Sequence, residues 1–340
     1  MWAFYLDRAE HQTARQLGEE LLTIAQRQHD PTLLVGAHRA LGESLEWLGE
    51  LTAGQAHLQQ GIALANPQHL QSRTLFIGQS PDLDCLSRIA PVQWRLGYPD
   101  QALRQCREAL SLARVLAHPH SLASCLGWGT MLFQLCRERE ETLRHADEAV
   151  TLCTEQGLPF WLSMATILRG WALAELGDRE EGTGQLRAGL AAWRAAGSEI
   201  IQPYWFTLLA EACGKTGEFA EGIKLLDESL VLINKTGERF YQAEVYRIKG
   251  QLILEAPVQE QEDRIRKAET CFRKAIETAQ KQQAKSWELR ASTSLARLWR
   301  SQGKTVEAHT LLAGVYNWFT EGFDTKDLQE AKALIEELES

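Results

Sequence analysis

The feature that most constrains this chain is a turn that recurs at a nearly constant interval. Each turn follows a helix-like apolar run and precedes a second one. Most steps between turns are roughly 40 residues, and the last gap has room for two units, with the missing turn near Pro257 to Asp263. Such self-similarity predicts stacked helical hairpins, because each hairpin must bury its apolar face against its neighbours. Glycine occupies the same position in all but one of these turns, where arginine replaces it. The residues at this position are Gly49, Gly97, Arg137, Gly177, Gly217 and Gly303.

Both halves of each unit carry helical patterning. Before the Gly177 turn, Leu168, Trp171, Ala172 and Leu176 recur at three- and four-residue steps. The second halves repeat a small residue, a larger one and another small one, which lets two helix backbones approach closely. Strand signals are nearly absent, so we expect an all-α, right-handed α-solenoid of about seven or eight hairpins. The repeated triplets are Ala102, Cys106 and Ala109; Thr142, Ala146 and Ala149; Gly182, Leu186 and Gly189; Ala268, Phe272 and Ala275; and Ala308, Leu312 and Val315.

We expect a single solenoid over residues 1–340. It would hold a partial N-terminal unit over 1–32, repeat units over 33–323 and a C-terminal capping helix over 324–340. Asp324 and Thr325 can cap this last helix, expected from Lys326 to Leu338, whose polar outer face would shield the end of the stack.

Composition and charge exclude several classes of function. With 36 basic against 45 acidic residues, the net charge of -9 argues against an unspecific nucleic-acid binder. No apolar run in the sequence is long enough to span a membrane, and we expect no secretory leader because no charged and then apolar stretch opens it. The 7 cysteines form an odd number without any C-x-x-C pair, so we expect buried thiols in a reducing, cytoplasmic compartment.

One stretch, GDREEGTGQL, comes close to a phosphate-binding loop. A real loop needs lysine and then Ser or Thr after its second glycine, but Thr183 and Gly184 stand there. We interpret the stretch as a hairpin joint in which Gly182 stands at a helix crossing, and Gly184 has no evident role. The sequence also lacks G-x-S-x-G and H-E-x-x-H, and its histidines are scattered. We therefore expect no catalytic residues, no metal site and no cofactor.

The repeat units resemble the tetratricopeptide repeat, with units longer than the usual 34 residues. The repeat has a small residue near its position 8, and the units of this chain have Gly42, Ala90, Gly170, Ala210, Gly250 and Ala296 there. The longer unit is similar to the repeat arm of large bacterial signalling ATPases, including the maltose-regulon activator class. Three strings resemble the C-terminal region of bacterial proteins that join a nucleotide cyclase domain and an AAA/STAND-type ATPase to such repeats: Gly237 to Leu254, Ala284 to Trp299, and Phe319 to Leu338. The resemblance implies an upstream ATPase or cyclase, which residues 1–340 do not contain.

The resemblance also implies that the first helix of each unit faces a concave groove. That groove would be aromatic in its middle, then acidic, then basic near the C-terminus, which suits a peptide, a partner helix or a small effector. The basic end could also bind a terminal carboxylate or a phosphate. The alternative is an ordinary solvated surface with intramolecular pairs. The candidates are Arg39, Glu43, Trp94, Gln134, Trp171, Tyr204, Thr207, Glu211, Glu244, Arg247, Gln251, Arg290, Arg297 and Arg300.

These observations favour a non-enzymatic interaction or sensor module. It would bind a protein, peptide or small effector in the groove and regulate an attached ATPase or cyclase. A passive scaffold for self-assembly is the alternative. Catalysis would require a deep pocket with convergent titratable groups, which the sequence does not reveal.

Overall fold

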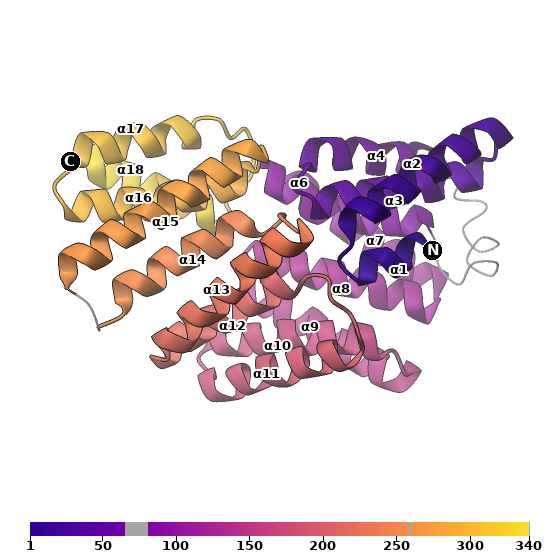
Figure 1. The fold of residues 1–340 in the computed structure, drawn as a ribbon, viewed down its shortest axis with the longest axis horizontal. Coiled ribbons are helices and arrows are strands. Elements are labelled where there is room, and N and C mark those ends of the chain that lie inside the picture. The colour runs from indigo at the N-terminus through magenta and orange to yellow at the C-terminus, as the bar shows by residue number, and fades with distance from the viewer. Residues whose placement is uncertain (65–80, 258–259, 340) are drawn as a thin grey trace.

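The computed structural model describes residues 1–64, 81–257 and 260–339, and the regular structure in these residues is helical. Figure 1 shows the helices following one another in a curved stack, which confirms the expected right-handed α-solenoid. The helices are α1 (Trp2–Asp7), α2 (His11–Gln28), α3 (Pro31–Trp47), α4 (Leu51–Leu64), α6 (Pro81–Leu96), α7 (Pro99–Leu116), α8 (Pro119–Leu135), α9 (Arg139–Gln156), α10 (Pro159–Leu176), α11 (Arg179–Ala195), α12 (Gln202–Thr216), α13 (Phe219–Thr236), α14 (Gln242–Glu255), α15 (Gln261–Lys281), α16 (Lys285–Ser301), α17 (Thr305–Tyr316) and α18 (Lys326–Glu339).

From α3 onward, the helices pack as consecutive hairpins, with α3 against α4, α6 against α7, and so on to α16 against α17. The first helix of each hairpin lies on the inner side and the second on the outer side. The final helix, expected from Lys326 to Leu338, is confirmed as α18. No helix in the described part of the chain is long and apolar enough to cross a membrane.

The recurring turns adopt a left-handed backbone conformation, which ends one helix and lets the chain reverse. Each of the six turn residues identified from the sequence has a positive φ, from +61° at Arg137 to +109° at Gly177. Arg137 shows that the turn geometry is required even where glycine is missing. The turn expected near Pro257 to Asp263 falls between the end of α14 and the start of α15, and residues 258–259 lie outside the described residues.

The small residues of the second helices stand where two helices cross. A Cβ atom on Gly182 of α11 would lie 2.5 Å from the backbone nitrogen of Ala174 and 2.6 Å from the carbonyl oxygen of Gly170. Both of those atoms belong to α10, so only glycine permits this approach. A Cβ on Gly184, two residues further along α11, would meet no atom within 4 Å. The sequence prediction for Gly182 is therefore confirmed, and Gly184 has no packing role.

The solenoid curves so strongly that its second half packs against its first (Figure 1). The backbone N–H of Arg239 donates to the carbonyl of Trp47 at 2.7 Å, and the N–H of Glu199 donates to Asp7 at 2.8 Å. Near the C-terminus, the Ser286 hydroxyl donates to the carbonyl of Trp94 at 2.5 Å. These contacts join segments far apart in sequence, so the inner helices meet across the superhelix axis instead of lining one open channel.

Candidate functional site

The largest group of predicted residues meets in one cavity of about 400 Å³, which we call the charged cavity. Its walls come from α8, α10, α12, α14 and α16, with the turn after α8 and the starts of α9 and α18. The predicted residues in its lining are Gln134, Trp171, Glu211, Glu244, Arg247, Gln251, Arg290 and Arg297. Further lining residues are Arg137, Arg139, Glu175, Lys215, Tyr241, Thr293, Ser294, Lys326, Asp327 and Glu330.

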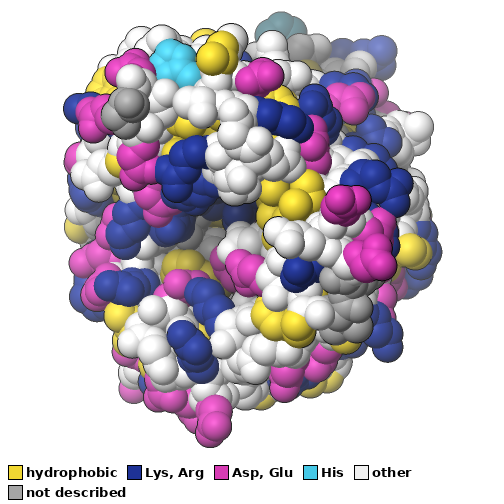
Figure 2. All heavy atoms as spheres, turned by 90° about the vertical axis from the view of Figure 1, so that its left-hand side faces the viewer, with side chains coloured by type: hydrophobic (Ala, Val, Ile, Leu, Met, Phe, Trp, Pro, Cys, Tyr) yellow, Lys and Arg dark blue, Asp and Glu magenta, His cyan; other side chains and the backbone are white. Residues whose placement is uncertain are grey.

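Positive side chains outnumber carboxylates in this lining, although the whole chain carries a net charge of -9. In Figure 2, Lys/Arg and Asp/Glu side chains surround a hollow on the face turned toward the viewer. The local excess of cations favours an occupant with negative charge. The cations are Arg137, Arg139, Lys215, Arg247, Arg290, Arg297 and Lys326, and the carboxylates are Glu175, Glu211, Glu244, Asp327 and Glu330.

One end of the charged cavity is held by ion pairs that join α18 to α16 and to the turn after α8. Arg290 Nε lies 2.7 Å from Asp327 Oδ2, and Arg290 Nη2 donates to the backbone carbonyl of Leu135. Arg137 Nη1 lies 3.2 Å from Asp327 Oδ1 and 2.8 Å from Glu330 Oε1. These pairs close the superhelix and form the cavity at the same place.

At the centre of the cavity, Glu244 accepts from Arg247 at 2.6 Å. Burial opposes ionisation of Glu244, but Arg247 and Arg290 outweigh it and hold the pKa of this carboxyl below its usual value. The pKa of Glu211 is instead raised, because burial outweighs the attraction of Lys215 and Arg247. Trp171 Nε1 donates to Glu211 Oε2 at 3.3 Å. The two neighbouring carboxyls therefore differ in their tendency to take up a proton.

A second cavity of about 460 Å³, the apolar cavity, adjoins the first one. Arg247, Gln251, Ser294 and Arg297 line both cavities and mark the junction between α14 and α16. The far side of the apolar cavity is different in character, because side chains of α14, α15 and α16 make it hydrophobic. These side chains are Leu254, Ile265, Phe272 and Leu298. The two cavities together form an extended groove with one charged and one apolar part.

Other predicted residues lie elsewhere. Arg39 and Glu43 line a separate cavity near the N-terminus. Trp94 is 2% exposed, Thr207 is 1% exposed and Tyr204 is 0% exposed, and none of them lines the cavities described here. Arg300 forms an ion pair with Glu337 of α18, outside the two adjoining cavities.

The placement of these buried residues corrects the expectation of one groove open along every unit. Because the superhelix closes, Trp94 packs edge-on against Trp287, with their ring centres 4.7 Å apart. The Tyr204 hydroxyl likewise donates a hydrogen bond to Gln134 Oε1 at 2.6 Å. The expected separation of acidic from basic stretches is also wrong, since the charged cavity mixes both signs.

Sequence reasoning missed the lining residues that come from turns and from α18. The repeat pattern places only first-helix residues on the inner side, whereas closure brings the turn at Arg137 and the first turn of α18 into the cavity. One signal could have found Arg137. It is a non-glycine residue at a turn position that needs positive φ, which costs energy and draws attention to a role for the side chain.

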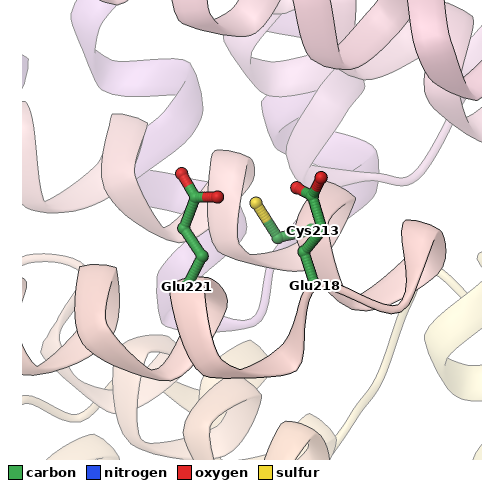
Figure 3. Close-up of side chains that lie close together, drawn as sticks. All are labelled: Cys213, Glu218 and Glu221. Atoms are coloured by element: carbon green, nitrogen blue, oxygen red, sulfur yellow. The ribbon is translucent and has the colours of Figure 1, made fainter.

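One cluster in the described residues has the composition of a metal site. The ligand atoms of Cys213, Glu218 and Glu221 lie within 4.8 Å of one another, and Figure 3 shows the sulfur between the two carboxylates. Arg187 pairs with both carboxylates, at 2.9 Å to Glu218 and 2.5 Å to Glu221. Burial raises the pKa of Cys213 to about 12, which disfavours the thiolate that a metal requires. The cluster is therefore arranged around a guanidinium rather than as a metal site.

No protein-family model matches the chain. An uncharacterized protein of Rhizobium meliloti is 20% identical over 298 residues, which make up 87% of this chain and 28% of that protein. The chain thus spans less than a third of the relative's length.

Several solved structures share the fold. The Rap protein complexed with Competence and Sporulation Factor has a TM-score of 0.61 at 11% identity, with 99% of this chain and 95% of that chain covered. The APC/C hetero-tetramer Cut9-Hcn1 gives 0.59 at 12% identity, covering 100% of this chain and 55% of that one. The apo form of RapI gives 0.51 at 11% identity, covering 96% and 99%. The chain is thus a solenoid of tetratricopeptide-like helical hairpins. At these identities the comparison shows the fold alone.

Proposed function

We propose that this chain is a non-catalytic protein-interaction module that binds an extended peptide in the charged and apolar cavities. The observation that carries the proposal is the continuity of these two cavities through Arg247, Gln251, Ser294 and Arg297. A single small molecule would need only one of them. A peptide presents side chains at regular intervals, so it can occupy both.

The chemistry of the lining defines the peptide. Excess cations in the charged cavity favour an acidic side chain, and the apolar cavity favours a large hydrophobic side chain nearby in the sequence of the peptide. The protein carboxylates in the charged cavity would reject a basic segment by like-charge repulsion. The Rap protein, which shares the fold, forms a complex with Competence and Sporulation Factor, and this supports a ligand-binding role for this chain.

The lining itself supports a binding role over catalysis. Its arginines are committed to carboxylates, as in the pairs of Arg290 with Asp327 and Arg247 with Glu244. Among the described residues that line the two cavities, none is a cysteine or a histidine. A nucleophile positioned beside a free base, which acyl or phosphoryl transfer would need, is not part of this arrangement.

We further propose that the module regulates an ATPase or nucleotide cyclase domain in a longer protein. The three C-terminal strings described above support this idea, and so does the position of the groove. Its lining includes two arginines that make contacts across the closure, since Arg137 pairs with Asp327 and Arg290 donates to the carbonyl of Leu135. A peptide that competes for these arginines would change the balance between closed and more open superhelices and so move a tethered domain.

Binding is tested with fluorescein-labelled peptides of about ten residues that carry Asp or Glu next to Leu or Phe, measured by fluorescence anisotropy. We expect Arg297→Glu to weaken binding at least about tenfold, because the reversed charge repels the acidic side chain. Leu254→Ser should weaken binding through the apolar cavity. A peptide with Lys in place of the acidic residues should not bind.

Arg114→Glu is a matched control, because Arg114 has a similar exposure and also forms an ion pair between helices, with Glu148 at 2.9 Å. The proposal is wrong if no acidic peptide binds or if both charge reversals have the same effect.

Light scattering on the same samples addresses the scaffold alternative, because self-assembly would give a mass that rises with concentration. Regulation is tested by adding the peptide to a longer protein that contains the module. Unchanged ATPase and cyclase activities would contradict it.

A further inference from the structure

A third cavity of about 410 Å³, the N-terminal cavity, lies apart from the groove. It is formed by α1, α3, α6, α8 and the start of α10, and none of its lining residues is shared with the charged or apolar cavity. Aromatic rings make up much of its wall. Trp128 stands edge-on to Trp161 with ring centres 6.0 Å apart, and Trp161 stands edge-on to Phe160 at 4.9 Å. Such a wall suits a flat or apolar ligand body.

A buried arginine lies in this aromatic wall. Arg88 is 1% exposed, and its guanidinium carbon lies 4.6 Å from the ring centre of Trp47 and 4.0 Å from that of Trp128. Arg88 Nη2 lies 2.7 Å from Glu46 Oε2, but Glu46 also pairs with the buried Arg95. Two buried guanidinium groups thus share one carboxylate.

Several donors in this wall are unsatisfied. Arg88 Nε and Nη1 have no hydrogen-bond partner among the described residues, and neither does Trp47 Nε1. Both side chains line the cavity. Buried donors without an acceptor are rare in folded proteins, and they are costly because the group has lost its water. A molecule in the cavity that supplies an acceptor would remove that cost.

We propose that the N-terminal cavity binds a small organic carboxylate with an apolar or aromatic body. The carboxylate would accept a charge-assisted hydrogen bond from Nε or Nη1 of Arg88, the donors that lack a partner among the described residues. The apolar body would lie against Trp128, Trp161 and Phe160. The volume of the cavity is within the range of small-molecule sites and suits one ligand of about amino-acid size or somewhat larger.

The lining of the cavity also carries acidic groups. Asp7, Glu43 and Asp84 line it, and Arg39 pairs with Glu43 at 2.9 Å and with Asp84 at 2.9 Å. An ammonium group on the ligand could bind to these carboxylates, so both a free amino acid and a simple aryl acid carry the required carboxylate and body. The two sources differ only in the ammonium group, and the experiment separates them.

The probes are phenylalanine, 3-phenylpropionate and phenethylamine, which share one aromatic body and carry a carboxylate and an ammonium, a carboxylate alone, and an ammonium alone. Binding to the 340-residue chain is measured by isothermal titration calorimetry and by ligand-observed NMR. We expect at least one carboxylate to bind with a stoichiometry near one and phenethylamine not to bind. Phenylalanine binding more tightly than 3-phenylpropionate would identify an amino-acid site, and the reverse order would identify an aryl-acid site.

Arg88→Met should weaken carboxylate binding at least about tenfold while keeping a side chain of similar length between the rings. In case this variant unfolds, Ala3→Trp provides a second test, because Ala3 is exposed and lines the cavity, so a large side chain there would fill it. Arg114→Met is the control and should bind as the unmodified chain does.

The proposal is wrong if neither carboxylate binds at about 10 mM, if phenethylamine binds equally well, or if a folded Arg88→Met or Ala3→Trp variant binds normally. The first result would mean that water alone satisfies these donors. Arg297→Glu should leave carboxylate binding unchanged, so this inference and the proposed peptide groove can fail separately.

Discussion

Gly182 and Gly184 allow a sharp test of the packing argument, because they lie two residues apart in the same helix and face different surroundings. In Gly182→Ala, the new Cβ would stand 2.5 Å from the backbone nitrogen of Ala174 and 2.6 Å from the carbonyl oxygen of Gly170. Backbone atoms cannot rotate away, so α10 and α11 must separate. Overpacking of this kind costs about 1 to 3 kcal/mol, and we expect the upper part of that range.

Gly184→Ala places its Cβ in open space. Alanine is favoured over glycine in a helix by about 1 kcal/mol, so this variant should be more stable than the unmodified chain. Because the gain in helix propensity is common to both positions, the two variants should differ by the overpacking cost, about 1 to 3 kcal/mol in the free energy of unfolding.

The assay is urea unfolding followed by far-UV circular dichroism, with the midpoint compared at constant slope. Hydrogen exchange of the α10 and α11 amides localises the effect, because a forced separation of these helices should increase exchange there first. A Gly182→Ala midpoint equal to or above that of the unmodified chain would refute the close-approach argument. A Gly184→Ala midpoint below it would refute the assignment of open space.

Three further predictions concern charge and thiols. Arg290→Met removes a partner of Asp327 in the closure, so we expect a loss of about 3 kcal/mol in unfolding free energy and a larger radius of gyration by X-ray scattering. Because the pKa of Glu211 is raised in the folded state, stability should fall as pH rises from the usual value of 4.5 through that raised pKa, and Glu211→Gln should flatten this fall in urea midpoints. Burial raises the pKa of Cys106 to about 12, so this thiol should react with a colorimetric thiol reagent at about pH 8 only after unfolding.

The local part of the fold follows from the sequence because turns and helix crossings have local causes. The turn at Arg137 could be placed from spacing alone, since neighbouring turns fix the length of the unit. Gly182 could be placed at a crossing because the same small–large–small pattern recurs in other second helices. In both cases, one unit predicts the next.

The closure of the superhelix has no such local cause. Small rotations at each hairpin interface add up along the stack, and their sum decides whether Trp94 meets Trp287 or solvent. The sequence could therefore place Arg247 and Glu244 on the first helix of a hairpin, but it could not show that closure would bring Asp327 beside Arg137. Part of the site is local in origin and part depends on the overall curvature.

The contacts that close the superhelix also bear on how the protein folds. An open repeat array loses its end units one at a time, because each unit depends only on its neighbours. Here the hydrogen bond from Ser286 to the carbonyl of Trp94 spans 192 residues, so the last hairpins cannot fray without breaking contacts to the first ones. Loss of one end therefore weakens the other, and such distant contacts form late because a long loop must close first. The chain should fold slowly for an all-helical protein and unfold as one cooperative unit.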